Sequence, residues 1–105
     1  MRYGLSVTIH VKPGQRDAVV GILMRDVEAS RALGCDLYMV GVSDDKPDVV
    51  YVTEVWVSRQ AHHASLRDPA VQAAIAEAMP MLTGEFHSTE FSLVGGLGVP
   101  QGSAA

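Results

Sequence analysis

The chain has 105 residues, 48% of them hydrophobic and 19% charged, which fits one domain around one core. The formal net charge of −4, with only 8 Lys and Arg, excludes the basic stripe that a nucleic-acid-binding domain needs. No apolar run reaches the roughly 18 residues of a membrane span, and the N-terminus has no signal-peptide pattern. Cys35 is the single cysteine, which excludes an internal disulfide and, with these absences, leads us to expect a cytoplasmic protein.

The first half of the chain predicts a strand, a helix and a second strand. Apolar residues alternate with small or polar residues over 3–12, the pattern of a half-buried strand. Apolar residues at helical spacing over 18–30 predict a helix, and Gly34 stands where such a helix would stop. The segment 35–42 predicts a second strand, and the polar segment 43–48 predicts the turn that follows it.

The second half predicts a strand, a short helix, a longer helix and a last strand. Segment 49–57 is rich in β-branched and aromatic residues and predicts the third strand. Ser58 is a candidate N-cap for a short helix that carries two histidines. Asp68 followed by Pro69 predicts the start of the longer helix, which has an apolar stripe. Segment 86–94 predicts the fourth strand.

The order of these elements predicts an α+β domain with a ferredoxin-like βαββαβ fold, an antiparallel sheet and both helices on one face. We assign residues 1–96 to this domain and 97–105 to a flexible C-terminal tail. Both faces of strand 49–57 are largely apolar, and the helices can cover only one of them. Because a monomer rarely leaves such a face in water, we expect a homodimer formed through the other face of the sheet.

Three segments of the chain resemble the antibiotic biosynthesis monooxygenase domain. They are "HVKPG", "EASRALGCDLYMV" and "VYVTEVWVSRQAHHASLRDPAVQAAIAEAMPML", and the similarity runs from Tyr3 to about Gly96. The resemblance implies a dimeric α/β barrel built from ferredoxin-like units. It also implies a monooxygenase of the quinol type that needs no cofactor and uses molecular oxygen as co-substrate to oxidise phenols, quinols or anthrones.

Two departures from the family pattern reduce the range of substrates that the resemblance implies. The anthrone oxygenases of the family have an asparagine four residues before the tryptophan, where this chain has Val52. The related haem-degrading branch uses an asparagine, a tryptophan and a histidine at positions that correspond here to Val7, Ser65 and Ile75. The resemblance therefore does not extend to haem degradation.

The Glu-x-Trp of the family's third strand matches Glu54 and Trp56, and the histidine of its following helix matches His62. The chemistry needs a base for one proton, polar groups that stabilise an oxyanion, and a flat apolar pocket. We expect His62 to accept the proton, Glu54 to orient or relay it, and Trp56 to wall the pocket. Each residue also fits a structural role, namely helix packing for His62, an ion pair for Glu54 and core packing for Trp56.

Further candidates for substrate binding come from the strands and helices around these three residues. Adjacent His63 points about 100° away from His62 on a helix, so it is expected to face solvent or the partner subunit. The residues expected to contact the substrate are Tyr38, Tyr51, Val52, Leu66, Met79 and His10, although His10 equally fits the polar rim of the sheet.

The histidines give no recognisable metal motif. Neighbouring residues on a helix diverge, so His62 and His63 cannot share an ion, and the sequence has no His-x-x-x-His and no pair of cysteines. His10 and His87 belong to separate predicted strands and would meet only through folding. We therefore expect neither a metal nor a cofactor.

Two other functions remain open on the sequence alone. The same anion-stabilising pocket would serve a cofactor-free isomerase or cyclase acting on an enolisable substrate. A non-catalytic dimer that binds a small ligand would need the pocket only, because a fold does not fix a function.

Overall fold

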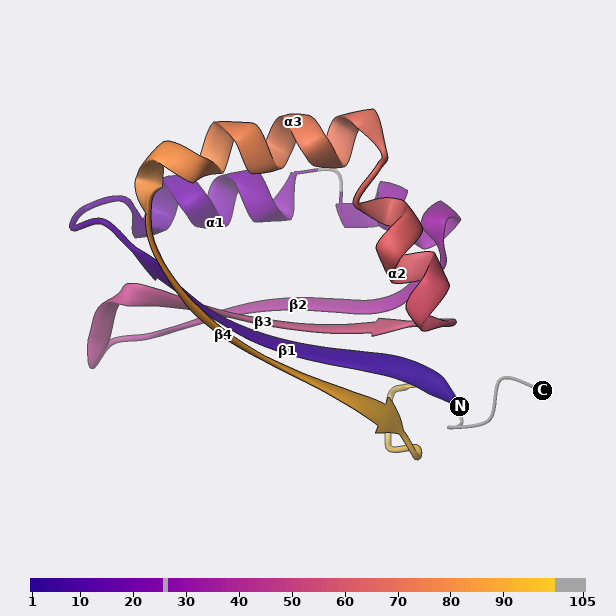
Figure 1. Ribbon diagram of the computed structural model, residues 1–105. Helices are drawn as coiled ribbons and strands as arrows, with labels where there is room; N and C mark the ends of the chain where they lie inside the picture. The colour runs from indigo at the N-terminus through magenta and orange to yellow at the C-terminus, as the bar shows by residue number, and fades with distance from the viewer. Residues whose placement is uncertain (26, 100–105) are drawn as a thin grey trace.

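A four-stranded antiparallel sheet with helices on one face forms the described part of the chain (Figure 1). This computed structural model describes residues 1–25 and 27–99. The elements in chain order are β1 (Arg2–Val11), α1 (Arg16–Met24), the 3-10 helix η1 (Val27–Leu33), β2 (Cys35–Ser43), β3 (Lys46–Trp56), α2 (Arg59–Ser65), α3 (Pro69–Ala78), the 3-10 turn η2 (Met79–Met81) and β4 (Leu82–Leu93).

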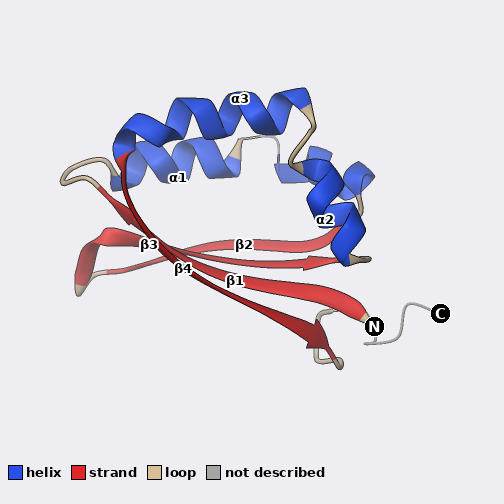
Figure 2. Ribbon diagram, in the orientation of Figure 1, coloured by secondary structure: helices blue, strands red, loops and turns tan. Residues whose placement is uncertain are grey.

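The strands lie in the order β2-β3-β1-β4, and every neighbouring pair is antiparallel. The helices α1, α2 and α3 all lie on one side of this sheet (Figure 2). The long central pairing of β1 with β3 runs from Tyr3 opposite Trp56 to His10 opposite Val49. This arrangement confirms the predicted ferredoxin-like α+β fold.

The core lies between the sheet and the helices. Successive strand residues point to opposite faces, so one alternating set from each central strand meets the helices. Val11, Val50 and Val52 supply that set at one end of the sheet, where they pack with Val19 of α1. A second cluster at the other end consists of Tyr3, Leu5, Cys35 and Trp56. Burial of these two clusters fixes the register of the sheet, because a slip by one residue would expose both.

The helix predicted over 18–30 is wrong in its extent. The α1 helix ends at Met24, Arg25 takes an extended backbone conformation with ψ of 135°, and a separate 3-10 helix starts at Val27. Gly34 ends this 3-10 helix with a φ of 103°, a conformation that favours glycine. The apolar spacing survives the break because η1 packs on β2 and α2. Periodicity therefore identified the buried side of α1, where Val19 and Ile22 are buried, and gave the wrong end for the helix.

Both predicted helix starts are confirmed. The Ser58 side chain accepts a hydrogen bond from the Ala61 N–H at 3.0 Å at the start of α2. The Asp68 carboxylate accepts hydrogen bonds from the N–H groups of Ala70 and Val71 at the start of α3. These caps hold α2 at the C-terminal end of β3, which fixes where its histidines lie.

The last strand begins at Leu82, four residues before the predicted start, and ends at Leu93. Leu97 in the predicted tail is fully exposed. Residues 100–105, the greater part of that tail, lie outside the described residues. The expectation that the tail is flexible stays a prediction.

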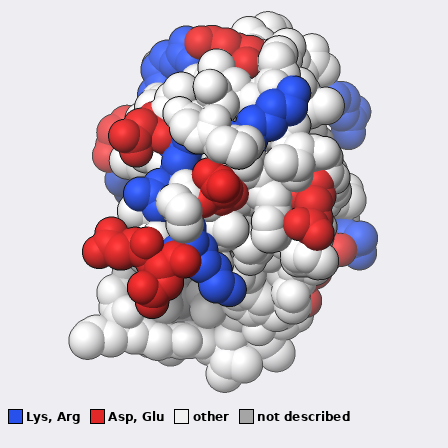
Figure 3. Space-filling model, turned by 90° about the vertical axis from the view of Figure 1, so that its left-hand side faces the viewer, with Lys and Arg blue, Asp and Glu red and all other residues white. Residues whose placement is uncertain are grey.

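The described surface carries mixed charge. On the face shown in Figure 3, Lys and Arg side chains lie among Asp and Glu side chains. This agrees with the net charge of −4. Among the helices of residues 1–25 and 27–99, none has the length and apolar character needed to cross a membrane.

Candidate active site

A cavity of about 480 Å³ lies between the sheet and the helical layer. Its size is within the range of pockets that bind small organic ligands. Its walls come from the sheet and from α1, η1, α2 and α3, and they are mainly aliphatic. The aromatic, charged and hydrogen-bonding side chains in these walls are Arg25, Ser30, Tyr38, Glu54, Trp56, His62, Ser65, Asp68 and Glu77.

The third strand supplies the most buried polar pair of the cavity. Glu54 and Trp56 are two residues apart, so the alternation of β3 turns both toward the helices. Trp56, which is only 3% exposed, donates a hydrogen bond from Nε1 to Glu54 Oε1 at 2.9 Å. Burial raises the pKa of Glu54 above its ordinary value, and the Trp56 hydrogen bond acts in the opposite direction. The indole therefore steadies a carboxylate that would otherwise be costly to bury.

The helix α2 brings His62 to the same wall. Its Nε2 lies 4.0 Å from Glu54 Oε1, and its ring meets the edge of the Trp56 ring with centroids 5.4 Å apart. At 4.0 Å the two atoms make no direct hydrogen bond, but a hydroxyl group or a water between them would contact both. The Nδ1 atom is buried and has no hydrogen-bond partner among the described residues. Nε2 is therefore the nitrogen that a ligand in the cavity would reach.

The imidazole of His62 stays neutral at neutral pH. Burial lowers its pKa below 6.5, the nearby His63 lowers it further, and Glu90 acts in the opposite direction. A neutral imidazole has one nitrogen free to accept a proton. The site thus combines a neutral base with a buried carboxyl group whose pKa is raised.

A second layer of contacts holds His62 in place. The Tyr3 ring stacks on the imidazole with centroids 5.4 Å apart, and the Tyr3 hydroxyl donates to Glu90 Oε2 at 2.8 Å. Glu90 also lies 3.3 Å from Nε of Arg59, the first residue of α2. Burial, reinforced by Glu90, raises the pKa of Tyr3 to about 12, so its hydroxyl remains a donor. These contacts tie α2 to β1 and β4.

Sequence reasoning missed the role of Tyr3 in this support. No motif contains it, and only the pairing of Tyr3 with Trp56 across β1 and β3 reveals that it shares their face. It also missed the ion pair between Arg25 Nη2 and Glu77 Oε2, 2.7 Å apart, which joins α1 to α3 beside the cavity. That contact depends on how the helices pack, and no local sequence pattern indicates it.

The three expected catalytic residues line one cavity, together with Tyr38 and Leu66 from the expected substrate contacts. Burial is the main cause that raises the pKa of Tyr38, and the Glu54 carboxylate adds to it. The Tyr38 hydroxyl therefore stays protonated and can donate a hydrogen bond into the cavity. His63 is exposed, as expected from its position on α2.

Four of the expected substrate contacts lie away from the cavity, and that part of the prediction needs correction. Val52 is packed into the core under α1, and Tyr51 points to the opposite face of the sheet because strand side chains alternate. Met79 is 59% exposed in η2, where the chain turns from α3 into β4. His10 lies on the face away from the helices, with Nδ1 3.1 Å from Glu85 Oε2.

The fold and the cavity together define a ferredoxin-like domain with a largely apolar cavity between its sheet and its helices. The sequence model of the antibiotic biosynthesis monooxygenase family matches residues 2–77, so the chain belongs to that family. A search of the curated proteins finds no match to this chain.

Solved structures named for the same family agree with this assignment. A protein from Chloroflexus aurantiacus is 39% identical, with a TM-score of 0.82 over 95% of this chain and 100% of that one. A protein from Caulobacter crescentus is 23% identical, with a TM-score of 0.79 over 90% of this chain and 91% of the other. One from Nitrosomonas europaea is 18% identical, with a TM-score of 0.80 over 95% and 93%. The last two show the shared fold alone.

The hydrogen bond between Trp56 and Glu54 gives a prediction about acidity. Replacing Trp56 with phenylalanine keeps an aromatic ring and removes the donor that favours the charged carboxylate. The pKa of Glu54 should therefore rise further in Trp56→Phe, and an NMR titration of the Glu54 side-chain carboxyl would measure it. Tyr38→Phe is the matched control, because Tyr38 makes no hydrogen bond to Glu54 in the described structure. An unchanged or lower pKa in Trp56→Phe would contradict the prediction.

Proposed function

We propose that this protein is a cofactor-free monooxygenase that oxidises a phenolic, quinol or anthrone-type aromatic to a quinone with molecular oxygen. The observation that supports this proposal best is the meeting of Glu54, Trp56 and His62 on the wall of one apolar cavity. Membership of the antibiotic biosynthesis monooxygenase family supports the reaction class. An aromatic substrate fits such a cavity because apolar walls bind its rings and a few polar groups orient its oxygens.

The first step is the removal of one proton. A substrate hydroxyl or acidic C–H placed beside His62 Nε2 loses its proton to the neutral imidazole. Glu54, 4.0 Å from that nitrogen, stabilises the imidazolium that forms. The Tyr38 hydroxyl is a donor for the substrate oxyanion. The protein's task is thus to produce and hold an electron-rich aromatic anion.

The later steps take their electrons from the substrate itself. The anion gives one electron to oxygen, and the resulting radical and superoxide combine to form a carbon–oxygen bond. Protonation of the outer oxygen then gives a hydroperoxide on that carbon. Loss of the remaining proton on that carbon breaks the O–O bond, so one oxygen atom stays as the quinone carbonyl and the other leaves as water. One molecule of oxygen is consumed for each molecule of product.

The face of the sheet opposite the helices supports a second proposal, a homodimer formed through this face. Met39 of β2 and Phe91 of β4 lie on it and are 55% and 39% exposed. Tyr51 and Thr53 of β3 are half-buried there. A second copy packed on this face would remove these side chains from water, which is favourable for apolar surface.

Removal of His62 should abolish oxygen consumption. Metal-stripped protein supplied with quinols and anthrones should take up one oxygen per product in an oxygen-electrode assay. His62→Ala should reduce kcat by about 10²–10⁴-fold, the usual effect of losing a positioned general base. His63→Ala, measured at pH 8, serves as the matched histidine control and should keep its activity. Turnover without oxygen uptake would point to an isomerase or cyclase, and binding without turnover to a ligand-binding domain; either result would overturn the proposal.

The lowered pKa of His62 sets the pH dependence of the reaction. The base is active when neutral, so kcat/KM should be constant near pH 7 and fall at acid pH with a midpoint below 6.5. His63→Ala removes one cause of the lowered pKa, and its acid midpoint should therefore move to higher pH. The assay needs a substrate that does not itself ionise between pH 4 and 8. A midpoint above 6.5, or no change in His63→Ala, would argue against His62 as the base.

The proposed dimer has a mass of about twice 11.2 kDa, which sedimentation equilibrium can measure at micromolar concentration. Met39→Glu places a charge on the sheet face and should shift the population toward monomer. Met24→Glu is the matched control, because Met24 is similarly exposed but lies on α1 in the helical layer. A wild-type protein that sediments only as an 11.2 kDa particle would refute the dimer.

A further inference from the structure

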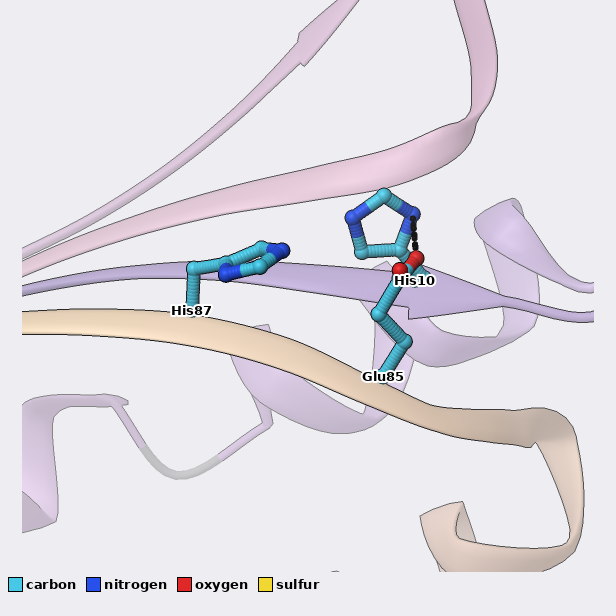
Figure 4. A group of neighbouring side chains, drawn as sticks. All are labelled: His10, Glu85 and His87. Atoms are coloured by element: carbon cyan, nitrogen blue, oxygen red, sulfur yellow. Dashed lines mark ion pairs between the residues drawn. The ribbon is translucent and has the colours of Figure 1, made fainter.

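We infer that His10, Glu85 and His87 form a binding site for a divalent transition-metal ion of the zinc type. The three side chains converge on the sheet face that points away from the helices (Figure 4). Each offers one ligand atom, and these atoms all lie within 4.8 Å of one another. Neither the family resemblance nor the cavity assigns any role to this group.

The pairing of β1 with β4 creates this group. Thr8 is the β-ladder partner of His87, so His10 lies diagonally across from His87 on the neighbouring strand. Glu85 and His87 are two residues apart on β4 and therefore share a face. The rings of His10 and His87 approach edge to face, with centroids 5.9 Å apart. Ladder pairing with Thr8 thus holds the backbone of His87 in place, and pairing with Val49 of β3 holds that of His10.

An irregularity in the ladder brings Glu85 into reach of His10. Ile9 pairs with Phe86 but Val11 pairs with Leu82, so β4 has extra residues opposite His10. Gly84, with a φ of 92°, accommodates the bulge, and the Thr83 hydroxyl donates to the His10 carbonyl oxygen at 3.3 Å. The same hydroxyl accepts a hydrogen bond from the Glu85 N–H at 3.1 Å. Bulges commonly redirect side chains in this way next to functional sites.

The donor set matches the chemistry of zinc and similar borderline ions. Two imidazoles and one carboxylate are typical of sites that keep a fourth position for water. Calcium and magnesium fit poorly, because they prefer oxygen ligands and this group offers one carboxylate. In a tetrahedral site with zinc–nitrogen bonds of about 2.0–2.1 Å, neighbouring ligand atoms are about 3.3 Å apart.

The distances are close to those that a metal ion requires. His10 Nδ1 and Glu85 Oε2 are already 3.1 Å apart. No two ligand atoms are more than 4.8 Å apart, so each remaining separation must shrink by at most about 1.5 Å to reach a tetrahedral edge. Glu85 and His87 are exposed in the single subunit, so rotation of their side chains can close this gap without moving the core. The site thus has a fixed backbone and mobile ligand groups.

This site is separate from the oxidation chemistry proposed above. His10 points to the face opposite the cavity, which Glu54, Trp56 and His62 line on the other side of the sheet. The metal-site proposal therefore does not depend on the monooxygenase proposal, and either can fail without the other. Sequence reasoning predicted no metal because residues 10, 85 and 87 show no ligand spacing until the first and last strands pair.

The test is a metal titration of untagged, chelator-treated full-length protein. Zinc added alone in a calorimeter should bind at one ion per chain with micromolar or lower Kd, and cobalt(II) should give the visible absorption of a tetrahedral complex. His10→Ala and His87→Ala should each weaken zinc binding by about 10–100-fold or more, since loss of even outer-shell partners costs that much. His63→Ala, an exposed histidine on α2, is the matched control and should bind as the wild type does.

Glu85→Gln removes a ligand with little risk of unfolding the protein, because the Glu85 side chain is exposed and glutamine has the same size. Zinc should raise the Tm of the wild type, and this rise should be smaller in Glu85→Gln while the metal-free Tm stays unchanged. The inference is overturned if zinc shows no saturable binding at micromolar concentration. It is equally overturned if the double variant His10→Ala/His87→Ala binds like the wild type, or if His63→Ala weakens binding as much as His87→Ala does.

Discussion

A carboxylate inside an apolar cavity is the constraint from which the arrangement of the site follows. Glu54 needs a partner where water is scarce, and the indole of Trp56, two residues along the same strand, provides it. That hydrogen bond fixes the carboxylate where the imidazole of His62 reaches it from α2. The capped start of α2 and the stacking of Tyr3 then hold the imidazole at that distance. Strand alternation, a helix cap and one aromatic contact thus assemble three polar groups on one wall.

Local periodicity predicted the strands and helices, and the family resemblance singled out the three central residues of the site. Glu54 and Trp56 share a face by strand alternation, and Ser58 starts the next helix, so His62 had to lie near them. The break between α1 and η1 escaped prediction because apolar spacing reports which side is buried and not whether the helix is continuous. The prediction that Tyr51 and Val52 both contact the substrate was wrong for a related reason. Neighbouring strand residues face opposite sides of the sheet, so at least one of the two had to point away from the cavity.

Contacts between distant strands stayed hidden for a different reason. Tyr3 meets His62, and His10 meets Glu85 and His87, only after β1 takes its place between β3 and β4. Register between strands that are far apart in sequence depends on the whole core, so no short motif records it. The bulge at Gly84 also shifts the register of β4 against β1, which the pattern of a regular strand does not predict.

The ion pair between Arg25 and Glu77 links α1 to α3 beside the cavity, and it adds little to the stability of that side. Its two side chains are each half exposed, and such surface pairs contribute only about 0–1 kcal/mol. On the other side, Tyr3, Glu90 and Arg59 tie α2 to the sheet through stacking, a hydrogen bond and a charge contact. The contact between α1 and α3 is therefore the more weakly held side of the cavity, and the attachment of α2 to the sheet is the stronger one. Dissolved ions screen that outer pair, so a saltier solution weakens the link between α1 and α3 and leaves the buried hydrogen bond of Trp56 to Glu54 largely unaffected.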